Sequence, residues 1–418
     1  MKVLEINVVC GYGSTGRIVV DLYNTLKSQG HECLCAYGRF SAPENENINT
    51  IRIGKKIDNY IHVFNTRIFD KHGFSSKRAT KEFIKRVEEY NPDIIHLHNI
   101  HGYYINIEIL FDYLKKSGKP VVWTLHDCWA FTGHCSYFDY KGCNKWVKGC
   151  KNCIQKKEYP QSIFIDNSKN NYIDKKRIFT QLDNLIIITP SIWLANLVKK
   201  SFLSKYSIKV INNGIDLEIF KPTKSDFRKK YNIQGKKILL SVSNIWEKRK
   251  GIEYLIELAK ILDSSYQLVI VGKIDKKLKE KLPSNIICID RTNNVKELVE
   301  IYSVADLFIN TTLEDNFPTV NLEALACGTP VISFDTGGCS ETVKNTCGVI
   351  VEKEDFKALV KIIKKIRIKD SNNIIIENNC INLEKCIEES RTFDKKEKYN
   401  EYINIFKEVL LFNTVYKV

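Results

Sequence analysis

The sequence contains no uninterrupted apolar run of about 20 residues, the length that a membrane-spanning helix needs. Glu5 and Asn7 interrupt the first strand-like segment, so we do not expect a secretory signal there. These two absences argue against an integral membrane protein and against a secreted one. We therefore expect a cytoplasmic protein.

Acidic residues are also in deficit, with 49 Asp and Glu against 64 Lys and Arg, and the formal net charge is +15. Such a charge favours anionic partners, namely phosphates, nucleic acid or the inner leaflet of a membrane, although a solvated basic surface would explain it equally well. The 418 residues are enough for two domains, and a hydrophobic content of 44% is enough to bury two cores.

Two series of alternating strand and helix patterns run along the chain. The first begins with a strand at 3–9 and a helix at about 16–29, and the second begins near residue 208. The strands are near-continuous apolar runs, which is typical of parallel sheets covered on both faces. We therefore expect an α/β fold of two doubly wound, Rossmann-like domains, spanning residues 1–207 and 208–392. Ligands of such sheets bind beyond the carboxyl ends of the strands, where two facing domains would form a cleft.

A glycine loop follows the first strand. Gly11, Gly13 and Gly16 match G-x-G-x-x-G, a pattern that lets the backbone approach a phosphate at a helix N-terminus. A dinucleotide site also needs an acidic residue at the end of the second strand, where this sequence reads AYGR. Arg39 could instead meet the 2′-phosphate of NADP. Three interpretations remain: a dinucleotide site, a contact to another phosphate or to a sugar, and a purely structural turn.

The stretch TTLEDNFPTVNLEALACGTPVISFDTGGCSE, residues 311–341, places acidic residues around a proline-containing turn. Asp315 and Glu323 stand eight positions apart, and Glu314 precedes the first of them. A helix over 319–326 would direct its N-terminus at an anion, and Glu323 could accept two hydrogen bonds from a ribose diol. Helix capping explains either acid taken singly, but it does not explain the whole stretch.

This stretch resembles the E-x7-E region of family-4 retaining glycosyltransferases, which have the two-domain GT-B fold. The similarity continues through PDIIHLHN, TLHD, VINNGIDLEIFKP and WEKRKGIEYLI, and through the glycine loop with Arg17 after it. EDNFPT is similar to a subgroup that builds bacterial surface polysaccharides. The resemblance implies transfer of a sugar from a nucleotide-diphosphate sugar to a lipid-linked saccharide acceptor, in capsule, O-antigen or exopolysaccharide synthesis.

By position, the resemblance implies catalytic roles for Asp315, Glu323, Lys250 and His126. Asp315 stands where the family has its first Glu, which contacts the transferred sugar, and Glu314 is a candidate substitute for it. Glu323 matches the Glu that binds the ribose. Lys250 matches the basic residue that neutralises the diphosphate, and His126 matches a histidine near the donor sugar.

The resemblance also implies a donor-binding set, in which backbone amides of the turn before Glu323 hold the sugar and the diphosphate. Asn244 stands where the family usually has an arginine, and Arg249 is a candidate replacement for the lost cation. The predicted donor-binding residues are Gly13, Gly16, Asn244, Arg249, Phe317, Pro318, Thr319 and Val320. No Asp-x-Asp sequence occurs, consistent with a metal-independent transfer that requires no cofactor. Residues 393–418 would form a helix that returns to the first domain.

Histidines gather at the end of one strand, where His96, His98 and His101 stand close together in the sequence. A strand-end histidine is usually a structural group whose hydrogen bonds are satisfied. His98 nevertheless lies where an acceptor could bind. His98 and Arg17 are therefore the predicted acceptor contacts.

Cysteines are concentrated in an insertion at about 128–160. C-x-x-C contributes two thiolates and two more lie upstream, so a structural zinc could be held by Cys135, Cys143, Cys150 and Cys153. Free thiols, an iron–sulfur cluster and disulfides are the alternatives. Between 141 and 157 the insertion also has six lysines and Trp146 but no acid. Such a patch could bind nucleic acid, but beside a glycosyltransferase site it better suits an anionic membrane, and we predict no nucleic-acid partner.

A sugar-phosphate phosphorylase or epimerase on the same fold is an alternative, and functions of two other classes also compete with this prediction. An NADP-dependent oxidoreductase would use the glycine loop and Arg39, but it leaves the stretch from Lys250 to Glu323 unexplained. A zinc-containing nucleic-acid-binding protein would explain the charge and the cysteines, but not two α/β domains. We therefore expect a cytoplasmic glycosyltransferase that is peripheral on the inner face of the cell membrane.

Overall fold

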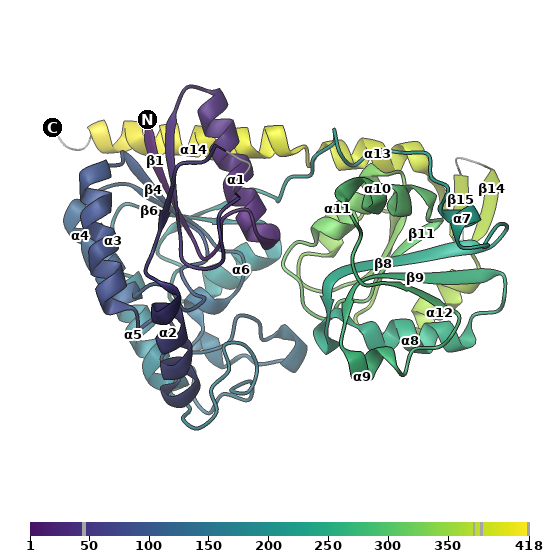
Figure 1. Cartoon of the computed structure of the whole chain (residues 1–418), viewed down its shortest axis with the longest axis horizontal. Coiled ribbons are helices and arrows are strands. Elements are labelled where there is room, and N and C mark those ends of the chain that lie inside the picture. The colour runs from purple at the N-terminus through teal and green to yellow at the C-terminus, as the bar shows by residue number, and fades with distance from the viewer. Residues whose placement is uncertain (44–46, 371–372, 377–378, 416–418) are drawn as a thin grey trace. The chain divides into compact units, whose positions relative to one another are not determined.

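The computed structural model describes residues 1–43, 47–370, 373–376 and 379–415, and the chain forms two compact units (Figure 1). Unit 1 comprises Met1–Ile211 and Tyr399–Val418, and unit 2 comprises Asn212–Lys398. The predicted α/β class with two Rossmann-like domains is confirmed, because each unit is built on its own parallel sheet.

Unit 1 has a seven-stranded sheet with the order β3-β2-β1-β4-β5-β6-β7. The strands are β1 (Lys2–Asn7), β2 (Glu32–Tyr37), β3 (Thr50–Arg52), β4 (Ile94–Leu97), β5 (Val121–Thr124), β6 (Leu185–Thr189) and β7 (Ser207–Val210). The helices are α1 (Gly13–Ser28), α2 (Lys56–Phe69), α3 (Lys77–Tyr90), α4 (Ile107–Ser117), α5 (Ser168–Phe179), α6 (Ile192–Lys200) and most of α14 (Lys395–Val415). The insertion contains the short 3-10 helices η1 (Trp129–Phe131), η2 (Asp139–Lys141) and η3 (Lys145–Val147).

Alternate residues of β1 point to opposite faces of the sheet, and both faces are covered. Leu4 and Ile6 pack in the core beneath α3, α4 and α5, whereas Val3 packs in the core beneath α1 and α14. Because α14 contributes Tyr402 and Phe406 to that second core, the last helix of the chain is an integral part of unit 1.

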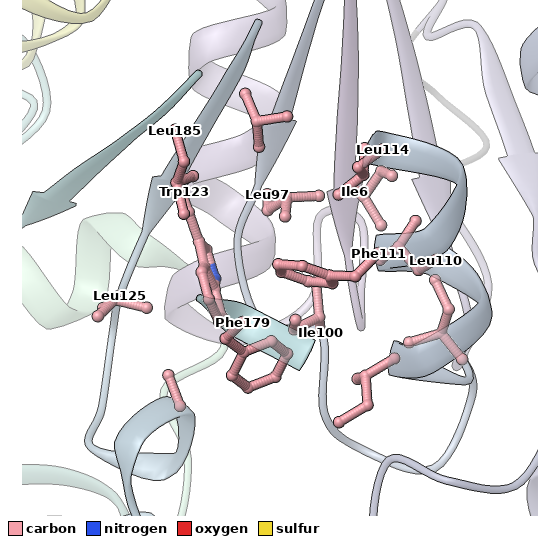
Figure 2. Close-up of a cluster of buried hydrophobic side chains, with 14 of the residues drawn as sticks. Ile6, Leu97, Ile100, Leu110, Phe111, Leu114, Trp123, Leu125, Phe179 and Leu185 are labelled. Carbon is pink, nitrogen blue, oxygen red and sulfur yellow. The ribbon is translucent and has the colours of Figure 1, made fainter. Parts of the chain in front are cut away.

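The core on the α4 side is centred on three aromatic rings (Figure 2). The Phe179 ring lies 4.9 Å from the Trp123 ring of β5 and 4.7 Å from the Phe111 ring of α4, measured between centroids. Full burial of each ring contributes roughly 2 kcal/mol to folding. The Trp123 indole also donates a hydrogen bond to the carbonyl oxygen of His98, 3.0 Å away. The core therefore fixes the backbone just after β4.

Unit 2 has a six-stranded parallel sheet with the order β10-β9-β8-β11-β12-β13, and a separate antiparallel sheet of β14, β15 and β16. The strands are β8 (Lys237–Trp246), β9 (Tyr266–Ile274), β10 (Ile286–Ile289), β11 (Leu307–Asn310), β12 (Val331–Phe334), β13 (Gly348–Val351), β14 (Arg367–Asp370), β15 (Asn373–Ile376) and β16 (Asn379–Asn382). The helices are α7 (Phe227–Lys230), α8 (Ile252–Ile261), α9 (Lys276–Lys279), α10 (Val295–Val304), α11 (Thr319–Ala326), α12 (Phe356–Lys364) and α13 (Leu383–Arg391), with the 3-10 helices η4 (Lys248–Lys250) and η5 (Ser340–Thr342).

The unit boundaries differ from the predicted ones by a few residues. The first lies after Ile211 rather than after 207, because β7 pairs with β6 and so completes the sheet of unit 1. The second lies after Lys398 rather than after 392, because Ile215 pairs with this segment: its N–H donates to Phe393 and its carbonyl oxygen accepts from the Lys395 N–H. The antiparallel sheet of β14–β16 was not predicted.

Candidate active site

The sheet of unit 2 reverses its chain order between β8 and β11, so the loops after these strands meet at a topological switch point. Lys250 ends η4, which follows β8, and Asp315 lies in the loop after β11. The ammonium Nζ of Lys250 lies 2.5 Å from Asp315 Oδ2, and the two side chains are 22% and 18% exposed. The fold thus brings two of the predicted catalytic residues into one ion pair.

Backbone contacts hold the two loops of this ion pair together. The Leu313 N–H donates to the Arg249 carbonyl at 2.7 Å. Gly251 has a φ of +70°, and a Cβ there would lie 1.8 Å from the Thr311 carbonyl oxygen. Gly337 has a φ of +59°, and a Cβ there would lie 1.7 Å from the Asp315 carbonyl oxygen. Side chains at these two glycines would displace the loops that carry Lys250 and Asp315.

Glu323 lies within α11, and its carboxylate oxygen Oε2 accepts a hydrogen bond from the Tyr302 hydroxyl at 2.8 Å. Tyr302 is fully buried on α10, and burial together with the Glu323 charge raises the pKa of its phenol well above the ordinary value. Tyr302 therefore stays protonated and acts as a donor that orients the Glu323 carboxylate. Sequence analysis did not predict a role for Tyr302, because Tyr302 lies in a different helix from Glu323.

Pro318 is the N-cap of α11, and Thr319 and Val320 form its first turn. The first N–H groups of a helix have no partner within the helix, and the helix dipole makes this end attractive to anions. Behind the turn, the Asn321 side chain is fully buried; it accepts from Asn310 at 2.9 Å and donates to Thr342 at 2.8 Å. Sequence reasoning missed this polar network, which ties α11 to η5.

The remaining predicted donor residues take different positions. Phe317 is buried, with its ring 5.6 Å from the Phe393 ring, so only its backbone is a candidate ligand contact. Asn244 is exposed near the end of β8, and the Arg249 guanidinium donates to Glu247 at 3.1 Å. Glu314 is 4% exposed, whereas Asp315 is the acid paired with Lys250. The arrangement therefore favours Asp315 over Glu314 as the first acid.

In unit 1 the chain order reverses between β1 and β4, and the glycine loop follows β1. The Gly11 N–H donates to the Gly16 carbonyl at 2.9 Å, and a Cβ at Gly16 would lie 3.1 Å from the Gly11 nitrogen. Gly13 begins α1 with a φ of +66° and has no atom within 4 Å of its missing Cβ. Arg17 is exposed one turn later. The loop thus brings backbone close to the surface at a helix N-terminus.

A buried chain of hydrogen bonds starts at the other side of this switch point. The Glu5 carboxylate of β1 accepts from His98 Nε2 at 2.8 Å, and His98 Nδ1 lies 3.0 Å from His126 Nε2. The same carboxylate lies 2.9 Å from His96 Nδ1, and His96 Nε2 lies 2.8 Å from the Thr124 hydroxyl. Sequence analysis did not predict a role for Glu5, although a charged residue inside an apolar strand was a visible signal.

Protonation states along this chain follow from its geometry. Burial alone would raise the pKa of Glu5, but interactions with His96 and His98 outweigh it and lower that pKa to about 2. Burial lowers the pKa of His98 to about 4 and that of His126 well below its ordinary value, so both rings are neutral at neutral pH. Since His98 Nε2–H donates to Glu5, His98 Nδ1 must accept, and His126 Nε2–H must donate to it. His126 Nδ1 is therefore a hydrogen-bond acceptor.

The sequence suggested that His98 contacts the acceptor, but in the structure His98 is not accessible. It is 1% exposed, and both of its ring nitrogens are engaged by Glu5 and His126. His101 belongs to a different contact, with Nε2 at 2.9 Å from Asp127 and Nδ1 at 3.1 Å from the Tyr159 hydroxyl. The three histidines near the end of β4 thus have different partners. His96 contacts Glu5 and Thr124, His101 contacts Asp127 and Tyr159, and His98 positions His126.

The four cysteines predicted as zinc ligands lie near one another, but no three of their sulfur atoms lie mutually within 4.8 Å. Cys135 donates a hydrogen bond to Cys153, which lowers the pKa of Cys153 to about 7, and Cys150 Sγ accepts from the Gly133 N–H at 3.2 Å. Cys135 belongs to the hydrophobic core, and Cys143 and Cys150 pack against it. Cys135, Cys143 and Cys150 therefore pack as small apolar residues, and we assign no zinc from this geometry.

Among the residues that the structure describes, the His, Cys, Asp and Glu groups whose ligand atoms lie mutually within 4.8 Å are Glu5, His96 and His98. Hydrogen bonds account for this approach, so we assign no metal there either. The predicted basic patch also differs from expectation, because Trp146 is buried against Phe131 and Phe138 and offers no exposed ring.

Within the described ranges, no helix combines the length and the apolar character that crossing a bilayer would require.

Comparisons with known proteins identify the family and the fold of the chain. Residues 15–219 match the family model of Glycosyltransferase Family 4, and residues 223–381 match that of glycosyl transferases group 1. WcaC of Escherichia coli K12, named as a colanic acid biosynthesis glycosyl transferase, is 25% identical over 380 residues, which cover 87% of this chain and 90% of that protein.

A UDP-Gal:alpha-D-GlcNAc-diphosphoundecaprenol alpha-1,3-galactosyltransferase of Escherichia coli is 26% identical over 205 residues, which cover 44% of this chain and 51% of that protein. Among solved structures, HepE of Anabaena in complex with UDP has a TM-score of 0.68 at 16% identity, with 98% of this chain and 100% of that chain covered. That likeness shows the fold alone. With matches along both units and a GT-B fold, the chain belongs to the family-4 GT-B glycosyltransferases.

Proposed function

We propose that this glycosyltransferase moves a sugar from a nucleotide-diphosphate sugar to a lipid-linked saccharide in the synthesis of a bacterial surface polysaccharide. The observation that carries the proposal is the Lys250–Asp315 ion pair at the switch point of unit 2. Asp315 stands four residues before α11 begins. The names of WcaC and of the galactosyltransferase support a polysaccharide product and a lipid-diphosphate acceptor, and UDP in HepE supports a nucleotide donor.

The proposed chemistry rests on charge stabilisation in unit 2. Breaking the bond between sugar and phosphate develops negative charge on the leaving diphosphate, and fixed cations and amides aimed at that charge lower the barrier. Lys250 and the first-turn amides of Thr319 and Val320 take this role. Asp315 holds the Lys250 ammonium in place when no donor is bound, and contacts the transferred sugar when one is. No protein metal enters this scheme.

The proposed reaction retains the configuration at the anomeric carbon, through an oxocarbenium-like transition state. Acceptor attack and departure of the diphosphate take place on one face of the sugar, and the leaving phosphate takes the acceptor proton. Asp315 is therefore not assigned as a nucleophile. Glu323 binds the ribose hydroxyls with its carboxylate oriented by Tyr302.

Unit 1 supplies the remaining groups of the proposal. His126 Nδ1, an acceptor by virtue of the Glu5–His98 chain, takes a hydrogen bond from a hydroxyl of the donor sugar. The glycine loop with Gly13 and Gly16 contacts the diphosphate, and Arg17 contacts the acceptor.

Thermal unfolding with UDP, GDP, ADP or NADPH tests the donor class. A nucleoside diphosphate present at 100 times its dissociation constant should stabilise the fold by roughly 2.7 kcal/mol. Stabilisation by NADPH alone would instead favour the oxidoreductase. The matching nucleotide sugars, assayed with a diphosphoundecaprenol-linked saccharide, then identify the sugar and the stereochemistry. Absence of transfer from every donor would contradict the proposal.

A further inference from the structure

Helix α2 turns its apolar side outwards. Ile57, Tyr60, Ile61 and Phe64 follow the i, i+3, i+4, i+7 spacing of one helix face, and they are 59%, 69%, 51% and 59% exposed. The residues that α2 buries, His62 and Thr66, are polar. A helix on the surface of a globular protein normally shows the reverse arrangement, so this face is built for something other than water.

A second exposed apolar segment adjoins this helix. Ile163, Phe164 and Ile165, from the loop before α5, are 50%, 69% and 44% exposed. The Ile163 N–H donates to the Arg67 carbonyl at 2.7 Å, which fixes this segment against the last turn of α2. We refer to these seven side chains of α2 and of the 163–165 segment as the apolar face.

Bases outnumber acids in the segments that carry the apolar face. Within residues 55–71 and 156–166 the bases are Lys55, Lys56, Arg67, Lys71, Lys156 and Lys157, and the acids are Asp58, Asp70, Glu158 and Asp166. Asp58 accepts from the Lys55 N–H as part of the helix cap, and Asp166 accepts from the backbone N–H groups of Cys153 and Ser168. Asp70 is buried and accepts from the Asn167 N–H, so three of the four acids accept backbone hydrogen bonds. Lys156 and Lys157, by contrast, extend the basic run that begins at residue 141.

We propose that the apolar face docks unit 1 onto an anionic lipid bilayer, with the apolar side chains entering the boundary of the acyl chains and the bases meeting lipid phosphates. An amphipathic helix with an apolar face flanked by bases binds an interface in this way. A second copy of this strongly basic chain is a poorer occupant, because its own bases would face those of the first. The inference deepens the proposed function, since a lipid-linked acceptor lies at such a surface, but vesicle binding can be measured without any sugar transfer.

Co-sedimentation of the full chain with vesicles tests this docking. Phosphatidylcholine vesicles that contain phosphatidylglycerol should bind the protein, pure phosphatidylcholine vesicles should bind it much more weakly, and added salt should weaken the binding. The double variant Tyr60→Ser/Phe64→Ser should reduce the partition coefficient at least about tenfold. The matched control Ile261→Ser/Val295→Ser, which removes two side chains of 42% and 44% exposure from unit 2, should leave it unchanged.

The charge component is tested separately with Lys56→Gln/Lys71→Gln, against Lys361→Gln/Lys364→Gln on α12. Only the first pair should reduce binding to anionic vesicles, and circular dichroism melts should show that all four variants fold. Stabilisation by UDP should be equal in all of them, so that a failure of docking is distinguishable from a failure of the donor assignment. Equal binding to neutral vesicles, equal losses in the controls, or a dimer in ultracentrifugation that Tyr60→Ser/Phe64→Ser abolishes would each overturn the proposal.

Discussion

The two units place their candidate site residues at the same point of similar sheets, but they use different chemistry there. All eight histidines of the chain lie in unit 1, and six of them are buried. Unit 2 has no histidine, and its site is built from the Lys250–Asp315 and Tyr302–Glu323 pairs. Neutral rings suit the recognition of sugar hydroxyls, whereas a fixed cation suits a diphosphate. The difference between the units is therefore a difference in the chemistry that each offers to a substrate, linked histidines in unit 1 and an ion pair in unit 2.

The largest effect among these predictions is a loss of turnover on substitution of Lys250 in unit 2. Lys250→Ala removes the cation that we propose stabilises charge on the leaving diphosphate, so turnover should fall by at least about 10²-fold. Steady-state kinetics with the preferred donor measures this. Lys248→Ala is the matched control, because Lys248 is 77% exposed and pairs with Glu253 rather than with Asp315. Equal losses in both variants would show that the effect is not specific to the site.

A second substitution acts through unit 1 alone. Glu5→Gln replaces a carboxylate that accepts from two histidines with an amide that also donates, so the His98–His126 tautomers are no longer fixed. We expect kcat/KM to fall about tenfold, while stabilisation by UDP stays unchanged, because UDP lacks the sugar that His126 is proposed to contact. Glu32→Gln, at an exposed position of the same unit, should change neither quantity. Loss of UDP binding in Glu5→Gln would contradict the division of labour.

Lowering the pH should destabilise unit 1 more than unit 2. Burial lowers the pKa of His62 to about 3 and that of His98 to about 4, whereas an unfolded histidine titrates near 6.5. As the pH falls from 6.5, the unfolded chain binds protons first, so each of these histidines costs unit 1 roughly 2 kcal/mol between pH 7 and pH 5. Calorimetry at the two pH values, with UDP to mark the transition of unit 2, should show the larger decrease for unit 1. His62→Gln should flatten this dependence, and an equal decrease in both units would argue against it.

The smallest effect is expected at Tyr302. Tyr302→Phe removes the hydroxyl that orients Glu323, a hydrogen bond worth about 1 kcal/mol, so the nucleotide should bind about fivefold more weakly. Tyr206→Phe in unit 1 is the control, because it also removes one hydroxyl, which donates to the Phe179 carbonyl. Calorimetric titration with UDP measures both variants, and equal affinities would show that Tyr302 has no orienting role.

Much of the fold could be predicted from the sequence, because apolar strands alternate with helices in both series. The helix predicted over 319–326 agrees with α11, and Lys250 and Asp315 were predicted as members of one site that the structure brings together. Contacts between distant segments could not be read from local patterns. Glu5 and His98 are 93 residues apart, and their pairing depends on β1 and β4 being neighbours in the sheet.

The insertion shows a second limit of sequence analysis. The spacing of its cysteines predicts a ligand set, but it does not predict how closely the thiols approach one another. C-x-x-C and two more cysteines suggested zinc, but whether four thiols converge depends on how the loop packs. Here Cys135, Cys143 and Cys150 pack in or against the core that contains Phe131 and Trp146. The outward apolar side of α2 escaped prediction for a related reason. A 3.6-residue period reveals that a helix is amphipathic, but it does not reveal which side faces the protein.

The indole of Trp123 is at once the centre of an aromatic core and the donor that holds the backbone of His98. The packing of this core and the position of His126 are consequently linked. A substitution in the core that tilts the Trp123 ring would move the His98 backbone, and with it the hydrogen bond to His126, although no polar residue had been changed. Attempts to make the enzyme more thermostable by redesigning that interior should therefore keep this one side chain unchanged.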